Sequence, residues 1–351
     1  MKPSFTDDMS SIITSRRLGL GLAGTALFLA LFFWRTDLSE LGDALAQANY
    51  WWVVPAVAIW FVSAAVRSLR WHYLLRGLVT LDARTLYPIV IIGYMANNLL
   101  PLRTGELVRA YVMGERHKVS KMSTLGTIAV ERVFDGVVLV SFLLLGGAIL
   151  GLSGELRALA AGMAVAFALL LAAFLYVASS PPLARRWTER LVALLPNVLH
   201  RSTHRLVDAF LEGLQGLQSA RLVALVLGTS LVAWLLEALM YYLVGLSFDI
   251  GEGFAAYLMV AAAANLAISL PSTSGGIGPF ELLAKETLTF LGVASATAGA
   301  YAVALHGLLL LPVIVAGLFF LWTINLSLGR TLRGGGGETA ETVGPLAGQP
   351  E

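Results

Sequence analysis

The stretch NNLLPLRTGE, residues 97–106, interrupts an apolar part of the chain with two amides, a proline and an arginine. The stretch LPSTSGGIGPFE, residues 270–281, interrupts a second apolar part with hydroxyls, glycines and two prolines. Lipid cannot hydrogen-bond a freed backbone group, so a helix broken at membrane depth survives only inside protein or against a water-filled cavity. Two such breaks, in corresponding places of two halves, are typical of a transport site.

The composition is that of an integral membrane protein. Of 351 residues, 57% are hydrophobic and 13% are charged, and the mean hydropathy is +0.77, whereas a soluble domain carries about 25% charged residues. The apolar runs are long, which favours helices over a barrel. The lack of cysteine excludes a disulfide frame, a thiolate nucleophile and a zinc–sulfur site.

The net charge and the lack of certain motifs exclude further classes of function. The formal net charge of +2 is too small to indicate nucleic-acid binding. The sequence contains no metal-ligand spacing, nucleotide-binding loop or catalytic triad. We therefore expect no cofactor, no metal and no enzymatic activity.

The sequence contains eight apolar windows that could enter a membrane. They lie at about 17–34, 50–66, 85–101, 123–150, 158–178, 221–246, 254–271 and 296–327. The first follows Arg16 and Arg17, as a signal peptide would, but its length favours an uncleaved span. Pro312 predicts a tilt or kink in the last window.

The distribution of Lys and Arg sets the expected topology, because short basic loops stay in the cytoplasm. Residues 67–84 and 103–121 are both rich in these residues, so we expect 85–101 to enter the membrane and return through 104–116 as a re-entrant hairpin. Acidic residues at 249–252 and basic ones at 330–333 require a second hairpin, from the opposite face, at 254–292.

The expected fold is therefore all-α and polytopic, with six full spans and two re-entrant helical hairpins. Repeat one, residues 50–150, recurs upside down as repeat two, residues 221–327, giving inverted-topology repeats. The alternative, eight plain crossings, conflicts with the charge rule in the middle of the chain.

The remaining segments complete the predicted domain organisation. Residues 1–16 form a cytoplasmic N-terminus, and residues 17–330 form the transmembrane domain. Within it, 181–220 is amphipathic and lies either on the cytoplasmic membrane surface or as a helical hairpin packed on the loops. The Gly- and Pro-containing tail, 331–351, is expected to be disordered. The protein is predicted to lie in a cell inner membrane, with both termini in the cytoplasm.

The first break offers amides and charges to a ligand. Asn97 and Asn98 can satisfy carbonyls freed by Pro101, and Thr104 can cap the returning helix. Arg103, Glu106 and Arg109 share one face by their i, i+3 spacing. They could form a positively charged binding site for a lipid phosphate, or a series of salt bridges that stabilises a short helix. The predicted binding residues here are Asn97, Asn98, Arg103, Gly105, Glu106 and Arg109.

The second break offers backbone donors. Its glycines permit positive φ and close approach of a ligand, Pro279 suits the first helical position, and Glu281 suits N3, where it can bond back to the cap. The N-terminus of the helix that follows is a typical anion-binding site. The alternative for Glu281 is that it only caps this helix. The predicted binding residues here are Ser272, Ser274, Gly275, Gly276, Gly278 and Glu281.

Charged side chains also occur within the spans. Glu131, Arg132 and Asp135 lie in window 123–150, and Glu237 lies in window 221–246. Charges at that depth face the bundle interior and are paired. They could be counter-charges and proton-coupling groups, or a structural ion network. His306, alone in an apolar span, is expected to be a hydrogen-bonded core residue.

In its motifs the chain resembles the flippase-like integral membrane family typified by the transmembrane domain of lysylphosphatidylglycerol synthetase. The matching pieces are Arg70-Trp71, Asn98-x-x-Pro101-x-Arg103-x-Gly105-Glu106-x-x-Arg109, Glu131-Arg132-x-x-Asp135 and Pro271-x-x-x-Gly275-Gly276-x-Gly278-x-x-Glu281. They cover roughly residues 15–330.

This resemblance implies transport of a phospholipid or polyprenyl-phosphate-type anionic lipid between leaflets. A lipid-modifying enzyme is a candidate partner. The chain ends soon after its last span, so we expect no soluble aminoacyl-transferase domain. Two other functions stay open at this point: an enzyme acting on a lipid-linked phosphate, and a scaffold subunit of a lipid-modifying system.

Overall fold

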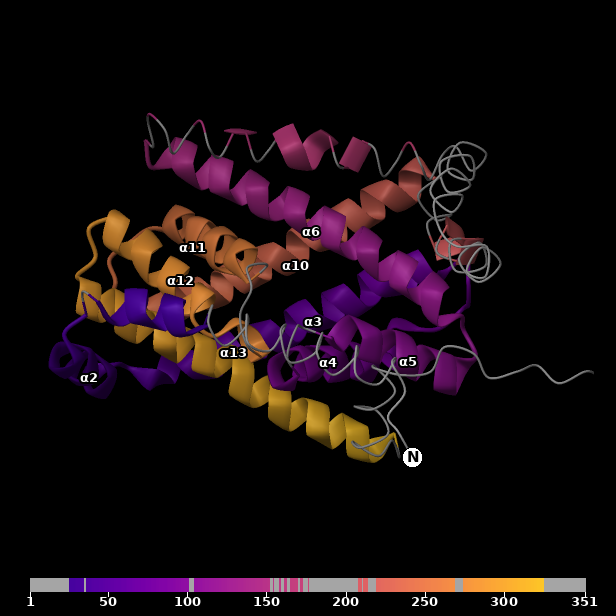
Figure 1. Cartoon of the computed structure of the whole chain (residues 1–351), viewed down its shortest axis with the longest axis horizontal. Coiled ribbons are helices and arrows are strands. Elements are labelled where there is room, and N and C mark those ends of the chain that lie inside the picture. The colour runs from indigo at the N-terminus through magenta and orange to yellow at the C-terminus, as the bar shows by residue number, and fades with distance from the viewer. Residues whose placement is uncertain are drawn as a thin grey trace, which may run out of the picture.

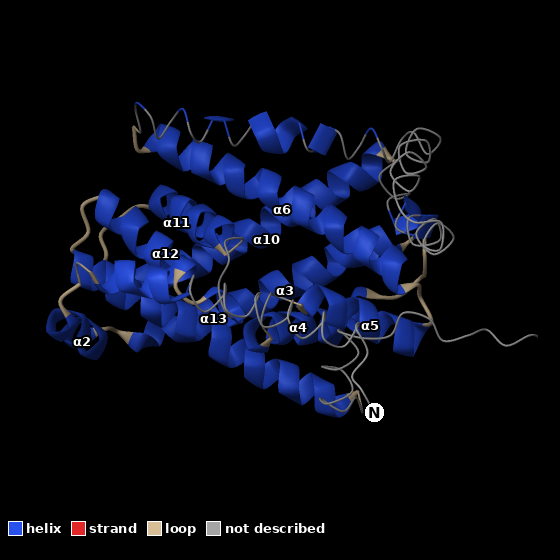
Figure 2. Cartoon of the chain, in the orientation of Figure 1, coloured by secondary structure: helices blue, strands red, loops and turns tan. Residues whose placement is uncertain are grey.

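The computed structural model describes residues 25–34, 36–100, 104–151, 219–268 and 274–324, with scattered positions between 154 and 213. These residues form helices joined by short loops, and none of them lies in a strand (Figures 1 and 2). Residues 25–33 are helical. The further elements are α2 (Leu38–Gln47), η1 (Tyr50–Trp52), α3 (Val53–Leu75), α4 (Ala83–Leu99), α5 (Gly105–His117), α6 (Lys121–Ile149), α10 (Ala220–Ser247), α11 (Phe254–Ala267), η4 (Ser274–Gly276), α12 (Pro279–Phe290) and α13 (Ser295–Thr323).

Three helical segments are both long and apolar enough to cross a membrane: Tyr50–Leu75, Ala220–Ser247 and Ser295–Thr323, within the part of the chain that the structure describes. The all-helical fold predicted from composition is confirmed. The six crossings and the re-entrant path of the hairpins stay predictions.

Each sequence break joins two short helices that pack against each other. α4 and α5 form the first helical hairpin, and α11 and α12 form the second. α5, α11 and α12 have 13, 14 and 12 residues, which at about 1.5 Å per residue is shorter than a hydrocarbon core of about 30 Å.

Glycine allows the close packing of the first hairpin. A Cβ added to Gly105 would overlap the carbonyl oxygen of Gly93 and come within 2.7 Å of the Asn97 side chain. A Cβ on Gly93 would lie 2.5 Å from Cγ of Arg109. Residues 93 and 97 of α4 thus face residues 109 and 105 of α5, which makes the two helices antiparallel.

The two hairpins lie toward opposite ends of the molecule (Figure 1). The described residues beside their breaks, at the end of α4 and in η4, are in contact. The Asn98 side-chain amide donates to the Leu309 carbonyl of α13 across 3.3 Å. A Cβ on Gly275 would lie 3.6 Å from the Asn98 carbonyl oxygen. α4 packs on both α13 and η4, while α3 and α10 pack along each other.

Each hairpin has its own apolar core. One cluster surrounds the second hairpin and includes Tyr257, Phe280 and Tyr301, together with Trp60 of α3. The other surrounds the first hairpin and includes Trp71, Val108 and Phe134. Burial of apolar side chains stabilises each hairpin independently of the polar groups described below.

The structure corrects the predicted end of the second span. Helix α3 does not stop at residue 66 but continues to Leu75. Arg67 and Arg70 are therefore buried helix residues, exposed by 6% and 0%, and not members of a cytoplasmic loop. Of the arginines assigned to that loop, Arg76 and Arg84 are exposed. Only these two arginines give the loop its positive charge.

Several predictions lie outside the described residues. They concern the N-terminus at 1–16, the start of the first span at 17–24, the 181–207 part of the amphipathic segment, the tail at 331–351, the residues Arg103 and Ser272, and the side chain of Ser274.

Candidate functional site

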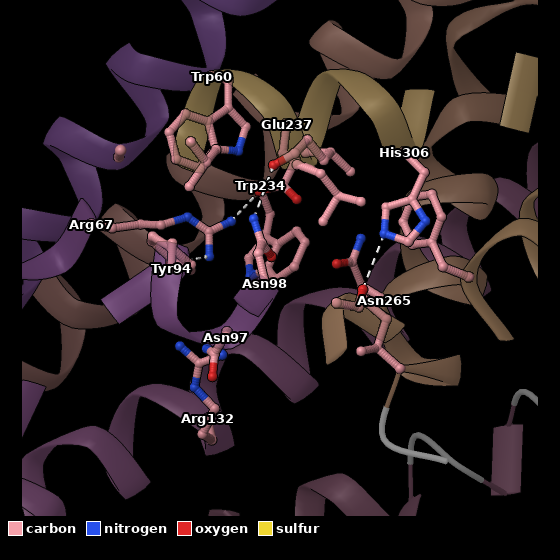
Figure 3. A pocket seen from close by; sticks show the side chains of 17 residues that line it. Trp60, Arg67, Tyr94, Asn97, Asn98, Arg132, Trp234, Glu237, Asn265 and His306 are labelled. Carbon is pink, nitrogen blue, oxygen red and sulfur yellow. Dashed lines mark hydrogen bonds and ion pairs between the residues drawn. The ribbon is translucent and has the colours of Figure 1, made fainter. Parts of the chain in front are cut away.

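A polar cavity of about 100 Å³ lies where the two breaks meet. Both breaks contribute to its wall, through Asn97 and Asn98 at the end of α4 and through Gly275 of η4. In Figure 3, Arg132 and Asn97 lie at one end of the cavity, and His306 lies at the other. The other polar or aromatic lining residues are Trp60, Arg67, Tyr94, Trp234, Glu237, Asn265 and Phe280.

A network of buried ion pairs borders this cavity. Arg109 binds Glu131 through two nitrogen–oxygen contacts of 2.8 and 3.2 Å. Arg70 lies 2.5 Å from Asp135, and Arg67 pairs with Glu237. These pairs link α5 with α6, α3 with α6, and α3 with α10. Removal of one partner from such a pair leaves an unpaired buried charge, which is strongly destabilising.

Aromatic and hydroxyl groups complete the partners of these arginines. The Arg109 guanidinium lies 3.9 Å from the centre of the Trp71 ring, and Arg67 lies 4.5 Å from that of Trp234. The Trp234 indole N–H donates to Asp135 across 2.8 Å. Arg67 also donates to the Tyr94 hydroxyl. Desolvated arginines gain from such ring contacts, so the network stabilises the packing of five helices, α3, α4, α5, α6 and α10.

Arg132 differs from the other three arginines. Its side chain is 37% exposed, and its nearest carboxylates, Asp135 and Glu131, lie 3.4 and 3.9 Å away. Both carboxylates have a closer arginine partner. Arg132 is therefore the least neutralised cation of the network, and it lines the cavity. A chemically suitable ligand for it is an anion.

The first break is closed by Asn97. Its side-chain oxygen accepts from the backbone N–H of Gly105 across 2.8 Å. The prediction that Thr104 caps the returning helix is wrong in part: Thr104 occupies the N-cap position, but its side chain makes no capping bond. Asn98 bonds to α13 and not to a carbonyl freed by Pro101. Glu106 lies in the first turn of α5, 3.4 Å from the Asn97 amide nitrogen.

The second break has the predicted cap. Gly275, Gly276 and Gly278 adopt φ values of 73°, 77° and 102°, which L side chains rarely adopt. Pro279 begins α12, and Glu281 accepts from the Gly278 N–H across 2.8 Å. The other Glu281 oxygen lies 2.7 Å from Nδ1 of His306. The cap prediction is confirmed, and the carboxylate has a second partner that the sequence did not indicate.

The structure therefore separates the predicted site residues that line the cavity from those that hold the structure around it. Lining the cavity are Asn97, Asn98, Arg132, Glu237 and Gly275. Arg109, Glu131 and Asp135 belong to the ion network beside it, and the side chains of Glu106 and Glu281 hold the two breaks. Gly105 closes the first hairpin, while Ser274, Gly276 and Gly278 form the turn of the second break.

Sequence reasoning missed part of the cavity. Arg67, Trp60 and Trp234 were not predicted: Arg67 was assigned to a loop, and the two tryptophans were not singled out from their apolar windows. The usable signal was the i, i+3 spacing of Arg67 and Arg70 within a continuous apolar helix. Among the described residues, no group of three or more His, Asp or Glu could hold a metal ion.

Comparison with known proteins places the chain in a family. Residues 18–317 match the family model described as the lysylphosphatidylglycerol synthase TM region. The chain belongs to this family. The resemblance inferred from the motifs is thus confirmed, together with the membrane nature of the protein.

Individual relatives are more distant. A UPF0104 membrane protein of Methanothermobacter thermautotrophicus is 26% identical over 276 residues, which cover 74% of this chain and 82% of that protein. A second one from the same organism is 24% identical over 290 residues, 79% of this chain and 84% of that protein. Glycosyltransferase AglD of Haloferax volcanii is 30% identical over 347 residues, 88% of this chain but 54% of that protein. No solved structure matches.

Proposed function

We propose that this protein moves an anionic lipid between the two leaflets of the membrane. The headgroup would occupy the cavity, and the hydrocarbon tails would stay in the surrounding lipid. The observation that supports this most is the meeting of two helix breaks, from opposite halves of the chain, at one polar cavity bordered by Arg132.

The membrane path of the chain is part of the proposal. The hairpins α4–α5 and α11–α12 would enter from opposite faces, with six full crossings around them and both termini in the cytoplasm of a cell with an inner membrane. Short antiparallel helices that end at the cavity suit this arrangement, because their backbone breaks are then kept away from lipid.

The proposed headgroup carries a phosphate. Arg132 offers a partly exposed guanidinium whose planar donors match phosphate oxygens. The amides of Asn97, Asn98 and Asn265 offer further donors and acceptors beside it. Either a phospholipid or a polyprenyl-phosphate-linked sugar would supply these partners, and the name of the glycosyltransferase relative supports testing the second kind.

The proposal is one of transport without a chemical reaction. The full glycosyltransferase relative is longer than this chain, and its activity is not assumed here. Incubation of the purified protein with polyprenyl phosphates should release neither phosphate nor sugar. Release of either would support a membrane enzyme instead.

The direct test is lipid exchange in liposomes that contain the purified protein. A fluorescent phosphatidylglycerol is placed in both leaflets, and dithionite quenches the outer one. The wild-type protein should let the inner pool be quenched much faster than in empty liposomes, and a zwitterionic phosphatidylcholine probe should show a smaller effect. If neither phosphatidylglycerol nor a labelled polyprenyl phosphate exchanges faster than in empty liposomes, the proposal fails.

Arg132→Gln provides the site-specific test. A hydrogen bond to a charged group contributes about 1.5–3 kcal/mol, so exchange should slow by roughly 10- to 100-fold. The matched control is Arg76→Gln, an exposed arginine at the end of α3 outside the cavity, which should exchange lipid like the wild type. Equal exchange by both variants would exclude Arg132 as the headgroup anchor.

A further inference from the structure

His306 of α13 connects both sides of the second break. Its Nδ1 lies 2.7 Å from Oε1 of Glu281, and its Nε2 lies 3.0 Å from the carbonyl oxygen of Gly275. The residues His306 and Glu281 are buried, with exposed fractions of 4% and 8%. The Phe280 ring packs against the imidazole at a centroid distance of 4.5 Å. The imidazole is thus held in a fixed place at the edge of the cavity.

The two contacts of the imidazole fix the number of protons at this site. A carbonyl oxygen only accepts, so Nε2 must carry a hydrogen and donate to Gly275. A hydrogen bond at Nδ1 then needs one more proton, either on Nδ1 itself or on Glu281. In both cases His306 and Glu281 together hold one proton more than a neutral imidazole and a free carboxylate would.

Loss of that proton would break one of the two bonds. A neutral imidazole has a single N–H, and it cannot donate to Glu281 and to Gly275 at the same time. If Nδ1 keeps the hydrogen, the Gly275 carbonyl is released. If Nε2 keeps it, the Nδ1 lone pair faces the carboxylate and the two repel. The first outcome frees the turn 274–276, which helps to line the cavity, from α13. The second frees α13 from Glu281, the residue that caps the helix following this turn.

Most of the other charged and titratable groups near this site have partners of their own. Lys285, on α12, donates to Phe32 and Thr36. On the far side of the cavity, Glu237 of α10 pairs with Arg67 of α3, while Tyr241 of α10 accepts from Asn265 of α11. α4 presents Tyr94, which accepts from Arg67, and the neutral Asn98. Arg132 of α6 lies across the cavity, next to Asp135. α2, with the acidic residues Asp37, Glu40 and Asp43, packs near Gly299, about two turns along α13.

We propose that His306 and Glu281 form a binding site for one exchangeable proton, and that release of this proton frees the turn 274–276 from α13. The cavity gives this proton a route to water, since His306 lines it. Resting on the transport function proposed above, proton binding at this site would couple headgroup access to a proton gradient or to pH.

The variant Glu281→Gln removes the exchangeable proton but keeps the hydrogen bonds, so it separates the effects of the two. The glutamine amide can donate to Nδ1 of a neutral His306, whose Nε2–H still donates to Gly275. The glutamine oxygen can still accept from the Gly278 N–H. All three bonds are kept without an exchangeable proton, so this variant should stay in the closed arrangement at every pH.

The test measures labelling of single cysteines, which is possible because the chain has no native cysteine. Ser274→Cys reports on the turn, and Thr80→Cys, at an exposed position of the α3–α4 loop, corrects for the pH dependence of the thiol itself. Maleimide labelling rates of the two proteins in lipid nanodiscs are compared between pH 5 and pH 9. Each reporter is placed in the wild-type and in the Glu281→Gln background.

In the wild-type background, the rate at position 274 relative to position 80 should rise with pH by about fivefold, the effect of one hydrogen bond on a two-state opening. In the Glu281→Gln background the ratio should stay at its low value. A ratio independent of pH in the wild-type background, or the same rise in both, would overturn the proposal. His306→Ala should give the high ratio throughout, and misfolding of that variant leaves the Glu281→Gln comparison decisive.

This measurement is independent of the transport function, because it contains no test lipid. If the protein shows the proton-dependent labelling but does not accelerate lipid exchange, the proposed proton site stands and the proposed transport function fails. If the protein accelerates lipid exchange but its labelling does not differ between the wild-type and Glu281→Gln backgrounds, the transport function stands and the proton site fails. Lipid exchange that varies with pH in the wild type but not in Glu281→Gln would support the coupling of the two.

Discussion

Substitution of Arg109 should damage the fold and not only lipid binding. Arg109 is 5% exposed, its guanidinium lies 3.9 Å from the centre of the Trp71 ring, and it supplies both close contacts of Glu131. In Arg109→Ala, the next arginines lie 3.8 and 3.9 Å from Glu131, which is beyond good hydrogen-bond distance. A buried carboxylate without its partner costs about 3–5 kcal/mol.

Thermal unfolding in detergent, followed by tryptophan fluorescence, measures this cost. For a protein of this size, a loss of 3–5 kcal/mol lowers the midpoint by on the order of 10 °C. The double variant Arg109→Met with Glu131→Met removes both charges and keeps the side-chain volume, so it should recover most of the stability. Arg70 keeps its closer partners, Asp135 at 2.5 Å and Ser230 at 2.9 Å.

The contrast with Arg132 gives the reasoning a sharp test. Arg132→Gln should unfold within a few degrees of the wild type, because the side chain is partly exposed and both neighbouring carboxylates have closer partners. If Arg109→Ala is instead as stable as the wild type and Arg132→Gln is the unstable protein, then the division between structural and ligand-binding arginines is wrong.

Two further predictions concern the hairpins. Gly105→Ala places a Cβ against the Gly93 carbonyl oxygen and the Asn97 side chain, so it should lower the free energy of unfolding by about 1–3 kcal/mol. Gly42→Ala is its control, since a Cβ there meets nothing within 4 Å; equal stability of the two would refute the tight-packing argument. If the first hairpin is re-entrant, cysteines at Thr80 and Glu115, both exposed, should be labelled by a membrane-impermeant maleimide from the same side of sealed vesicles. Labelling from opposite sides would show that α4 and α5 together cross the membrane.

Local signals predicted much of the helix arrangement, because apolar length and helix punctuation depend on nearby residues. The windows 123–150 and 221–246 agree closely with α6 and α10. Both breaks fall between helices, and the Glu281 cap was predicted from a spacing of three residues. These features need no knowledge of what lies across the bundle.

The errors arose where a distant partner decides. Arg67 looked like a loop residue because a charge usually ends an apolar span, but Glu237, 170 positions away in sequence, allows it to stay inside the helix. The Thr104 cap was wrong for a similar reason on a smaller scale, since the Asn97 side chain, eight positions earlier, already accepts from Gly105. The expectation that His306 is a hydrogen-bonded core residue is confirmed, and only its partners, in the turn and in α12, were not predicted.

The sequence ERVFD at 131–135 shows why the motif alone does not distinguish structural charges from a ligand-binding charge. Neighbouring positions on a helix point about 100° apart, so Glu131 faces Arg109 of α5 while Arg132 lines the cavity. Asp135, one turn on, faces Arg70 and Trp234. One helical turn therefore presents two structural anions and one available cation. The charge that the cavity offers depends on all three, since removing either carboxylate would leave more than one unneutralised arginine beside the headgroup site.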